Sequence, residues 1–447
     1  TNDDDDDDDD GDDGDGDGET VDNEDAVSIE TLGEGEEEIE QTSKDVKSSQ
    51  SHEHETPVKQ QMPHDAQNND KMNILEVCSF QEVTSSQDEV PPSQSSIEER
   101  IVVDSTQTVV TDARKHIRPK PRWGHTMTRI SNNRAILYGG QGHLEDFEET
   151  IFNDVHIYNI EEDMWSKPIN CEGLARQWHS TTYIPERQLL ISFGGETLCP
   201  KRGTRVTQEV MVLDTEIFLW YPPTCSGDVP SGRSGHSATV LTNSTSMVVF
   251  GGVRSGRWTN TMAVLDTLSW KWVAPKTQGD APRPRSYHSA TPVPREGKSW
   301  LVIFGGNNKN QSFNTVHCLE TDGKTWTWIN PVVSGDIPAP RTGHSATLLS
   351  DKRTILIHGG WDTMMDVEGK DMVFGDSYLL DTSNWTWTKN KVDSELFGDD
   401  NEENSKGPKR VGHCSILTSD GVLSFGGRNT ERDDVEFCDD LQIIRKT

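Results

Sequence analysis

Short apolar runs alternate with turn residues along most of the chain, and none keeps the helical spacing of about 3.6 residues. Within residues 285–330, four such runs follow one another: HSATPV, SWLVIFGG, NTVHCLE and TWTWIN. Runs of this length that are rich in β-branched and aromatic residues, and bounded by turn residues, predict β-strands. Four of them with tight connections predict one antiparallel meander.

This unit recurs six times. Each copy begins with Arg-x-x-His and carries Gly-Gly after its second apolar run, and successive glycine pairs are 55, 57, 54, 54 and 67 residues apart. A period of this size is typical of repeat architectures. The arginine and histidine pairs are Arg122/His125, Arg176/His179, Arg233/His236, Arg285/His288, Arg341/His344 and Arg410/His413. The glycine pairs are Gly139-Gly140, Gly194-Gly195, Gly251-Gly252, Gly305-Gly306, Gly359-Gly360 and Gly426-Gly427.

One four-stranded sheet is too small to bury both of its faces, so each must stack on its neighbours. Six sheets stacked radially make a propeller, which leaves only short free edges. The glycines allow close approach of backbones, and a tryptophan in the fourth strand supplies apolar area between sheets. These tryptophans are Trp165, Trp220, Trp270/Trp272, Trp326/Trp328 and Trp385/Trp387.

The order apolar run, Gly-Gly, Asn or Asp before a third strand, then Trp, resembles the kelch-repeat β-propeller family over residues 105–447. The resemblance implies an all-β, six-bladed propeller. It also implies binding of partner segments at one loop end, with arginines among the contacts. Four features depart from the pattern: RQWHS in unit two, Glu209 before the third strand of that unit, a long insertion in unit five, and the acidic loop SELFGDDNEENSKG that lengthens the last interval.

The sixth unit stops after three predicted strands, at DDLQIIRKT, without a tryptophan strand. We expect Thr106–Thr111 to supply the missing outer strand, because pairing the two ends of the chain would remove an open sheet edge. The alternative is a natural chain that continues past Thr447.

Charge divides the chain unevenly. Residues 1–110 hold 34 Asp and Glu against 5 Lys and Arg, with Phe80 as their one aromatic residue. Such a segment cannot bury enough apolar surface to offset its chain entropy. We therefore predict a disordered acidic tail and linker over residues 1–104 and one propeller domain over 105–447. The tail either solvates the protein or competes with an acidic partner for a basic surface.

Composition and short motifs also bear on the compartment and on the kinds of partner. Seven cysteines without a Cys-x-x-Cys pair favour a reducing compartment, cytoplasmic or nuclear. Glycosylation-type tripeptides at Asn243, Asn310 and Asn384 keep secretion open, and the start at Thr1 leads us to expect a missing or processed upstream piece. The basic stretch RKHIRPKPR is either a nuclear localisation signal or a linker into the first blade. We expect a monomeric propeller that binds neither membranes nor nucleic acid.

Strand parity places candidate chemistry at one end of the propeller. The 2–3 loops and the 4–1 loops between blades share an end, so the six arginines and the residues after Gly-Gly should surround the channel. In one interpretation they form a basic funnel for an acidic or extended protein segment; in the other, each Arg bonds carbonyls between blades and each His satisfies a buried backbone group. The predicted partner-binding residues are Arg122, Arg233, Arg254, Arg257, Trp258, Arg285, Asn307, Asn308, Arg341, Trp361, Arg428 and Asn429.

Positions that break the sixfold pattern are the stronger candidates, because a residue repeated in every blade usually belongs to the blade. Trp258 and Trp361 are predicted in loops beside arginines, the composition of an interface hot spot. Their alternative is a loop folded over its own core.

Phosphate-loop, H-E-x-x-H and nucleophile-elbow motifs are absent from the sequence. We therefore predict a non-catalytic scaffold or adaptor with no cofactor and no metal. The alternative is a propeller enzyme, of the metal-dependent oxidase or specifier type, with its site in the central funnel. The E-x-x-x-D-x-x-x-H stretch of the specifier proteins does not occur.

Overall fold

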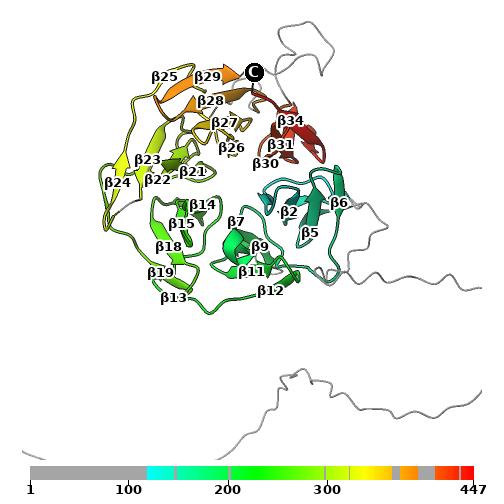
Figure 1. Cartoon of the computed structure of the whole chain (residues 1–447). Helices are drawn as coiled ribbons and strands as arrows, with labels where there is room; N and C mark the ends of the chain where they lie inside the picture. Colours follow the sequence, from blue (N-terminus) through cyan, green and yellow to red (C-terminus); the bar gives the residue numbers. More distant parts are fainter. Residues whose placement is uncertain are drawn as a thin grey trace, which may run out of the picture. The chain divides into compact units, whose positions relative to one another are not determined.

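The computed structural model describes residues 118–144, 148–199, 203–295, 298–321, 323–364, 373–390, 408–431 and 434–446. These residues belong to a compact unit, Ser96–Thr447, and form six small β-sheets around a central axis (Figure 1). The predicted all-β, six-bladed propeller is confirmed. The predicted acidic tail, residues 1–104, and the proposed closing strand, Thr106–Thr111, lie outside the described residues.

Blades 1 to 5 each contain a four-stranded antiparallel meander whose strands are used in chain order from the axis outward. Blade 1 consists of β1 (Thr126–Arg129), β2 (Arg134–Tyr138), β5 (Val155–Asn159) and β6 (Met164–Ser166). Blade 2 consists of β7 (Ser180–Ile184), β8 (Leu189–Phe193), β11 (Val210–Asp214) and β12 (Leu219–Tyr221), with a 3₁₀ turn, η1 (Pro185–Arg187). Blade 3 consists of β14 (Ser237–Val240), β15 (Ser246–Phe250), β18 (Met262–Asp266) and β19 (Lys271–Val273).

Blade 4 consists of β21 (Ser289–Arg295), β22 (Lys298–Phe304), β23 (Val316–Glu320) and β24 (Trp326–Ile329). Blade 5 consists of β26 (Ser345–Leu348), β27 (Thr354–His358), β28 (Ser377–Asp381) and β29 (Thr386–Asn390). The linkers before blades 3, 4 and 5 add short outer strands parallel to the fourth strand: β13 (Ser226–Gly227), β20 (Thr277–Gln278) and β25 (Ser334–Gly335).

Blade 6 has three strands within the described part of the chain: β30 (Cys414–Leu417), β31 (Val422–Phe425) and β34 (Leu441–Ile444). No described strand pairs with the outer edge of β34, and its expected partner, Thr106–Thr111, lies outside the described residues. Blade 6 nevertheless lies beside blade 1, because β30 contacts β1 as well as β26 (Figure 1).

The 2–3 connections of four blades fold into small hairpins of their own. These hairpins are β3 (Gln141–His143) with β4 (Glu149–Ile151), β9 (Glu196–Cys199) with β10 (Gly203–Val206), β16 (Val253–Arg254) with β17 (Arg257–Trp258), and β32 (Arg428–Glu431) with β33 (Asp434–Phe437). They rise directly from the Gly-Gly positions, so they surround one end of the channel. We call this end the loop face.

The Gly-Gly pairs make the junctions between blades. In every blade the N–H of the second glycine donates to the carbonyl of the arginine that opens the next blade, at 2.8–2.9 Å, and the bond from Gly427 to Arg122 closes the circle. A Cβ on the first glycine would lie 2.6–2.9 Å from Cε1 of the next blade's histidine, and one on the second would lie 2.7–3.0 Å from Cβ of its own blade's histidine. Only glycine fits at either position, because the two histidine side chains fill the space.

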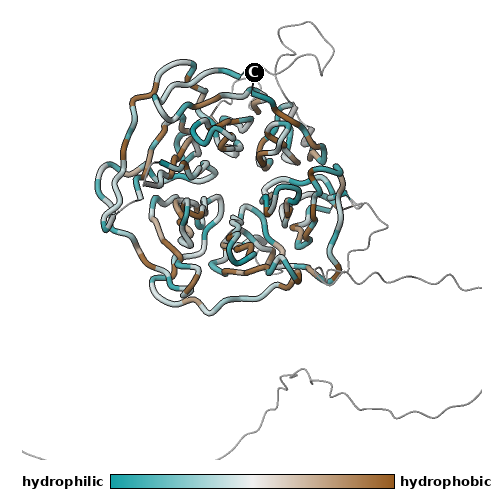
Figure 2. The backbone as a smooth tube through the Cα atoms, in the orientation of Figure 1, coloured by the Kyte–Doolittle hydropathy of each residue, from teal (hydrophilic) through white to brown (hydrophobic). Residues whose placement is uncertain are grey.

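Blade packing uses the predicted tryptophans. Trp272 and Trp387 are fully buried, and their rings lie 5.3 Å from Phe193 and 5.0 Å from Phe304 of the preceding blades. Hydrophobic positions therefore concentrate on the strands within the blades (Figure 2). Within the described ranges, no helix is long and apolar enough to cross a membrane.

We predict that Trp272→Ala lowers the free energy of unfolding by about 3–5 kcal/mol, because it leaves a cavity between two blades. Urea denaturation measures this change. The matched control, Leu268→Ala, removes a side chain that is 63% exposed and should change stability by less than about 0.5 kcal/mol. Equal effects of both substitutions would contradict this packing.

We also predict that deleting residues 1–115 destabilises the propeller, whereas deleting residues 1–95 does not, because only the longer deletion removes Thr106–Thr111 and leaves β34 without its expected partner. The longer deletion should lower Tm by at least about 2–4 °C, the shift that corresponds to roughly 1 kcal/mol in a large domain. Differential scanning calorimetry of both truncations tests this, and identical melting curves would refute the closure.

Candidate functional site

The six repeated arginines lie inside the blades. Their exposed fractions are 0–4%, and Nη1 of each donates to the carbonyl of the first glycine of the same blade, at 2.9–3.1 Å. The repeated arginines therefore do not form the expected basic funnel. Buried Arg122, Arg233, Arg285 and Arg341 donate to backbone carbonyls, much as the second interpretation of the sequence describes. We leave these four residues out of the binding surface. The physical reason is that the Gly-Gly turn leaves a buried carbonyl that needs a hydrogen-bond donor, and the long arginine side chain reaches it.

The charges of these arginines are balanced unequally around the ring. Asp154, Asp376 and Asp440 pair with the arginines of blades 1, 5 and 6. Burial raises the pKa of Asp154, but its hydrogen bonds from Arg122 and His156 outweigh this and hold it well below the usual value. In blades 2, 3 and 4 the corresponding bonds go to the hydroxyls of Ser192, Thr261 and Thr315, and no described carboxylate pairs with these arginines.

Six histidines line a central cavity of about 170 Å³. Five of them bond through Nε2 to a hydroxyl of the preceding blade, at 2.9–3.1 Å. For the sixth, His125, the corresponding residue of the preceding blade is Cys414 instead of Ser or Thr. Neither ring nitrogen of His125 has a hydrogen-bond partner in the described structure. Burial, assisted by the charge of the adjacent arginine, lowers the pKa of His125, His236 and His344 to about 3. These histidines are therefore neutral at pH 7.

Above the histidines, a circle of six backbone hydrogen bonds of 2.7–3.0 Å joins the residues that precede them. All six have positive φ; four are glycine, but Trp178 and Tyr287 have φ of 52° and 53°. Bulky residues rarely adopt this conformation. Their rings occupy the sites where a Cβ on Gly124, Gly235 or Gly412 would stand. They form a floor across the mouth of the channel, 4.8 Å apart between centroids.

A rim of twelve residues surrounds this floor. In each blade the residue after the arginine forms a backbone bridge with the residue after Gly-Gly, so the 2–3 and 4–1 loops share one end of the propeller, as predicted. The pairs are Trp123 with Gln141, Gln177 with Glu196, Ser234 with Val253, Ser286 with Asn307, Thr342 with Trp361, and Val411 with Arg428.

Arg428 and two tryptophans make the most asymmetric part of the rim. The Arg428 guanidinium lies 4.4 Å from the ring centroid of Trp123 and 5.6 Å from that of Trp361. Burial lowers its pKa, and the charge of Glu149 opposes this shift. Trp123 in turn contacts Trp178 edge to face, at 4.9 Å. One continuous, partly exposed aromatic and cationic surface therefore runs from blade 5 across the mouth to the floor.

The other predicted residues lie close to this rim. Asn307 accepts a hydrogen bond from Thr342 (3.1 Å), and Trp258 donates to Ser286 (2.9 Å), so both link neighbouring blades. Asn308 closes its own loop by accepting two backbone bonds. Arg254 and Arg257 are exposed on β16 and β17, and Asn429 lies on β32.

Sequence reasoning did not name Trp123, Trp178, Tyr287 or Arg205 as site residues, although RQWHS, which contains Trp178, was among the departures from the repeat. A usable signal existed for Trp178 and Tyr287, because the residue before each histidine is glycine in the other four repeats.

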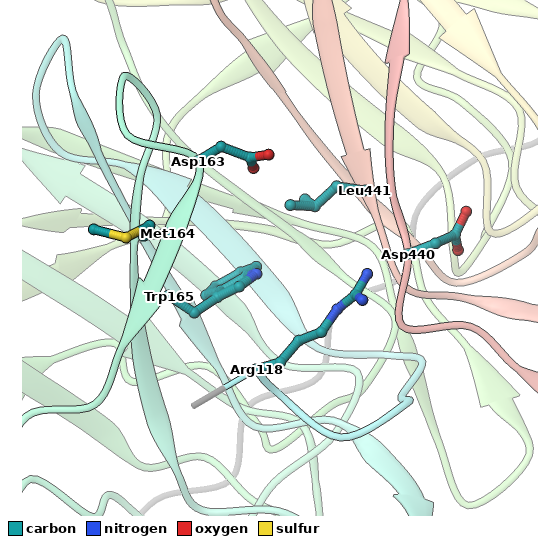
Figure 3. A pocket seen from close by; sticks show the side chains of 6 residues that line it. All are labelled: Arg118, Asp163, Met164, Trp165, Asp440 and Leu441. Atoms are coloured by element: carbon teal, nitrogen blue, oxygen red, sulfur yellow. The ribbon is translucent and has the colours of Figure 1, made fainter. Parts of the chain in front are cut away.

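The described residues also line two hollows outside the channel. One, of about 530 Å³, lies between the hairpins of blades 2 and 3 and is lined by Glu196, Thr204, Arg205, Val206, Ser234, Val253, Arg254, Ser255 and Gly256. The other, of about 440 Å³, lies between β6 and β34, where Arg118, Asp163, Met164, Trp165, Asp440 and Leu441 line it (Figure 3). The described residues contain no His, Cys, Asp and Glu cluster able to hold a metal ion.

Comparison with known proteins agrees with this architecture. A family model described as the KLHDC2/KLHL20/DRC7 Kelch-repeats domain matches residues 178–427, so the chain belongs to the kelch-repeat family. It is 28% identical to human Kelch domain-containing protein 3 over 333 residues, which cover 70% of this chain and 79% of that protein. It is 27% identical to Drosophila melanogaster Host cell factor over 338 residues, which cover 70% of this chain but 21% of that protein.

A solved structure entitled "Structure of YjhT" shares the fold, with a TM-score of 0.51, 17% identity, and coverage of 72% of this chain and 98% of that chain.

We predict that acid destabilises the propeller before its carboxylates titrate. The folded-state pKa of these histidines, about 3, lies below the unfolded value of about 6.5. The unfolded state therefore binds more protons between these values, and stability present above pH 6.5 is lost as pH falls. Each histidine contributes up to about 1.4 kcal/mol per pH unit. Urea denaturation at pH 7.5, 6.5 and 5.5 measures the slope; equal stability at all three would contradict the buried neutral ring.

Proposed function

We propose that this kelch propeller is a non-catalytic scaffold or adaptor that binds an extended segment of a partner protein across the mouth of its channel. The observation that carries the proposal is the asymmetric surface of Arg428, Trp123 and Trp361 above the aromatic floor. Interface hot spots are enriched in Trp, Tyr and Arg that stand close together. A rim built from six related blades has no structural need for such a cluster.

Backbone strain supports the same location. Four blades place glycine at the left-handed floor position, whereas Trp178 and Tyr287 hold it with bulky side chains. Conformations of this kind cost on the order of 1–3 kcal/mol each and concentrate at functional sites. The large rings also line the histidine-lined cavity of about 170 Å³, which leaves little room beside them for a bound chain. A partner would therefore lie over the floor as an extended segment instead of entering the channel.

Apolar side chains at the loop tips add contact area around the mouth. Leu144, Leu198 and Met364 are 40%, 51% and 47% exposed, and each belongs to a 2–3 connection of a different blade. Together with the central tryptophans, they would surround a bound segment with apolar contacts that exclude water. The location we propose for this interaction is the cytoplasm or the nucleus.

We predict that Trp361→Ala and Arg428→Ala each weaken partner binding by about tenfold or more, because the first removes one ring of the cluster and the second removes the guanidinium between the two rings. Affinity capture with the full chain identifies the partner, and titration calorimetry then measures its Kd for each variant. Lys271→Ala, on the outer strand of blade 3, is the control and should leave Kd unchanged. Unaltered melting curves would show that the effect is on binding.

Two results would count against the proposal. Partners that bind all three variants equally would place the interaction elsewhere on the chain. Stoichiometric copper or iron in the purified full chain would favour the alternative of a metal-dependent propeller enzyme.

A further inference from the structure

The loop face is polarised in charge. In blades 2 to 4 the described cations on or beside the 2–3 connections are Arg205, Arg254, Arg257 and Lys309, and the sequence between β9 and β10 adds Lys201 and Arg202. The connections of blades 1 and 6 carry the described acids Glu148, Glu149 and Glu436, with Arg428 as their one described Lys or Arg, whereas the connections of blades 2 to 4 carry two described acids, Glu196 and Glu209. The insertion of blade 5 is also acidic in sequence, WDTMMDVEGKDMVFGD.

The buried arginine ring has the same polarity one layer below. Blades 1, 5 and 6 supply a carboxylate to each arginine, through Asp154, Asp376 and Asp440. Blades 2, 3 and 4 supply hydroxyls, and Arg176 keeps Nε and Nη2 without a hydrogen-bond partner among the described groups. Buried charges are screened less than exposed ones. The uncompensated guanidinium groups therefore add to the positive potential of the hairpins above them.

The hollow between the hairpins of blades 2 and 3 lies in this positive sector. Arg205 projects from β10 and Arg254 from β16 on opposite sides of it. Neither makes an ion pair with a described residue. The single acid in the lining, Glu196, accepts a hydrogen bond from Ser234 at 2.7 Å and another from Gln177 at 3.4 Å. The volume of the hollow, about 530 Å³, falls within the range of roughly 300–1,000 Å³ typical of binding sites.

We propose that this hollow binds the carboxylate side chains of an acidic, extended segment of a partner protein, with Arg205 and Arg254 as the two clamps. The inference rests on the proposed function and adds to it the charge of the partner and its placement. Guanidinium groups recognise carboxylates through paired hydrogen bonds. The acidic loops of blades 5, 6 and 1 repel the same carboxylates, so the acidic part of the segment lies over blades 2 and 3.

A fluorescein-labelled peptide of eight aspartates tests the proposal by anisotropy with the full chain at 150 mM salt, where the Debye length is about 8 Å. An eight-asparagine peptide is the neutral probe. We expect the aspartate peptide to bind at least tenfold more tightly than the asparagine peptide. R205E/R254E should weaken its binding at least tenfold. The matched control K352E/R353E reverses two cations between β26 and β27, at the opposite end, and should change binding less than twofold.

Equal loss in the two double variants would overturn the proposal, because it would show a response to net charge alone. Absence of binding to the unmodified chain and to a chain with Asp3 to Asp10 all changed to Asn would overturn it too. Binding only after that neutralisation would also overturn it, since the hollow would then belong to the chain's own tail. Equal binding with and without neutralisation supports a partner in trans.

The two proposals fail separately. A captured partner that depends on Trp361 and Arg428, while the aspartate peptide fails to bind, would refute only the acidic-segment proposal. An aspartate peptide that binds through Arg205 and Arg254, while no partner depends on the rim cluster, would refute the rim as the central interface.

Discussion

The contact between a histidine ring and a bare glycine backbone is the constraint on which this propeller depends. At each junction the histidine of one blade lies where the preceding blade's glycine would carry a side chain. This close approach lets the second glycine donate to the next arginine carbonyl. It also sets how near the inner strands approach the axis, and so the width of the channel. The buried tryptophans farther out fill the wedge that widens between the blades.

This constraint decides which polar residues remain for recognition. A Gly-Gly turn leaves a carbonyl inside the protein, and the repeated arginine satisfies it, so the arginine ring becomes part of the scaffold. The two residues that follow the arginine lie at the loop end of each blade and differ from blade to blade, although the first of them is buried in five blades. Variation at these positions and after Gly-Gly produces the Trp123 and Arg428 contact and the strained aromatic floor. Variation within the 2–3 connections produces the unequal charge of the loop face. The proposed recognition residues Trp123 and Trp178 thus stand one and two positions after the structural arginines of their repeats.

Much of the fold follows from periodic features that each repeat carries locally. The positions of Gly-Gly, Arg-x-x-His and the outer tryptophans were enough to predict six blades, the shared end of the 2–3 and 4–1 loops, and the packing of Trp272 between blades. The residue type alone did not predict whether the repeated arginines are buried or exposed. The turn beside each arginine decides whether its guanidinium faces solvent or a carbonyl. Arg205 and Trp123 were missed because their importance comes from neighbours on other blades. The proposal for Arg428 and Trp361 came from their departure from the repeat, the same property that sets them apart in space.

The circle of backbone hydrogen bonds around the axis has no first or last member, since every link joins a residue to its counterpart one blade away. Because this circle of hydrogen bonds is closed, every blade has the same links to its two neighbours, wherever the blade lies in the sequence. Removing a blade breaks two links and leaves the remainder without a partner on either side. Growth or loss of blades by duplication must therefore re-form the whole circle at a new circumference. Relocation of the termini to another junction, as in a circular permutant, preserves every link.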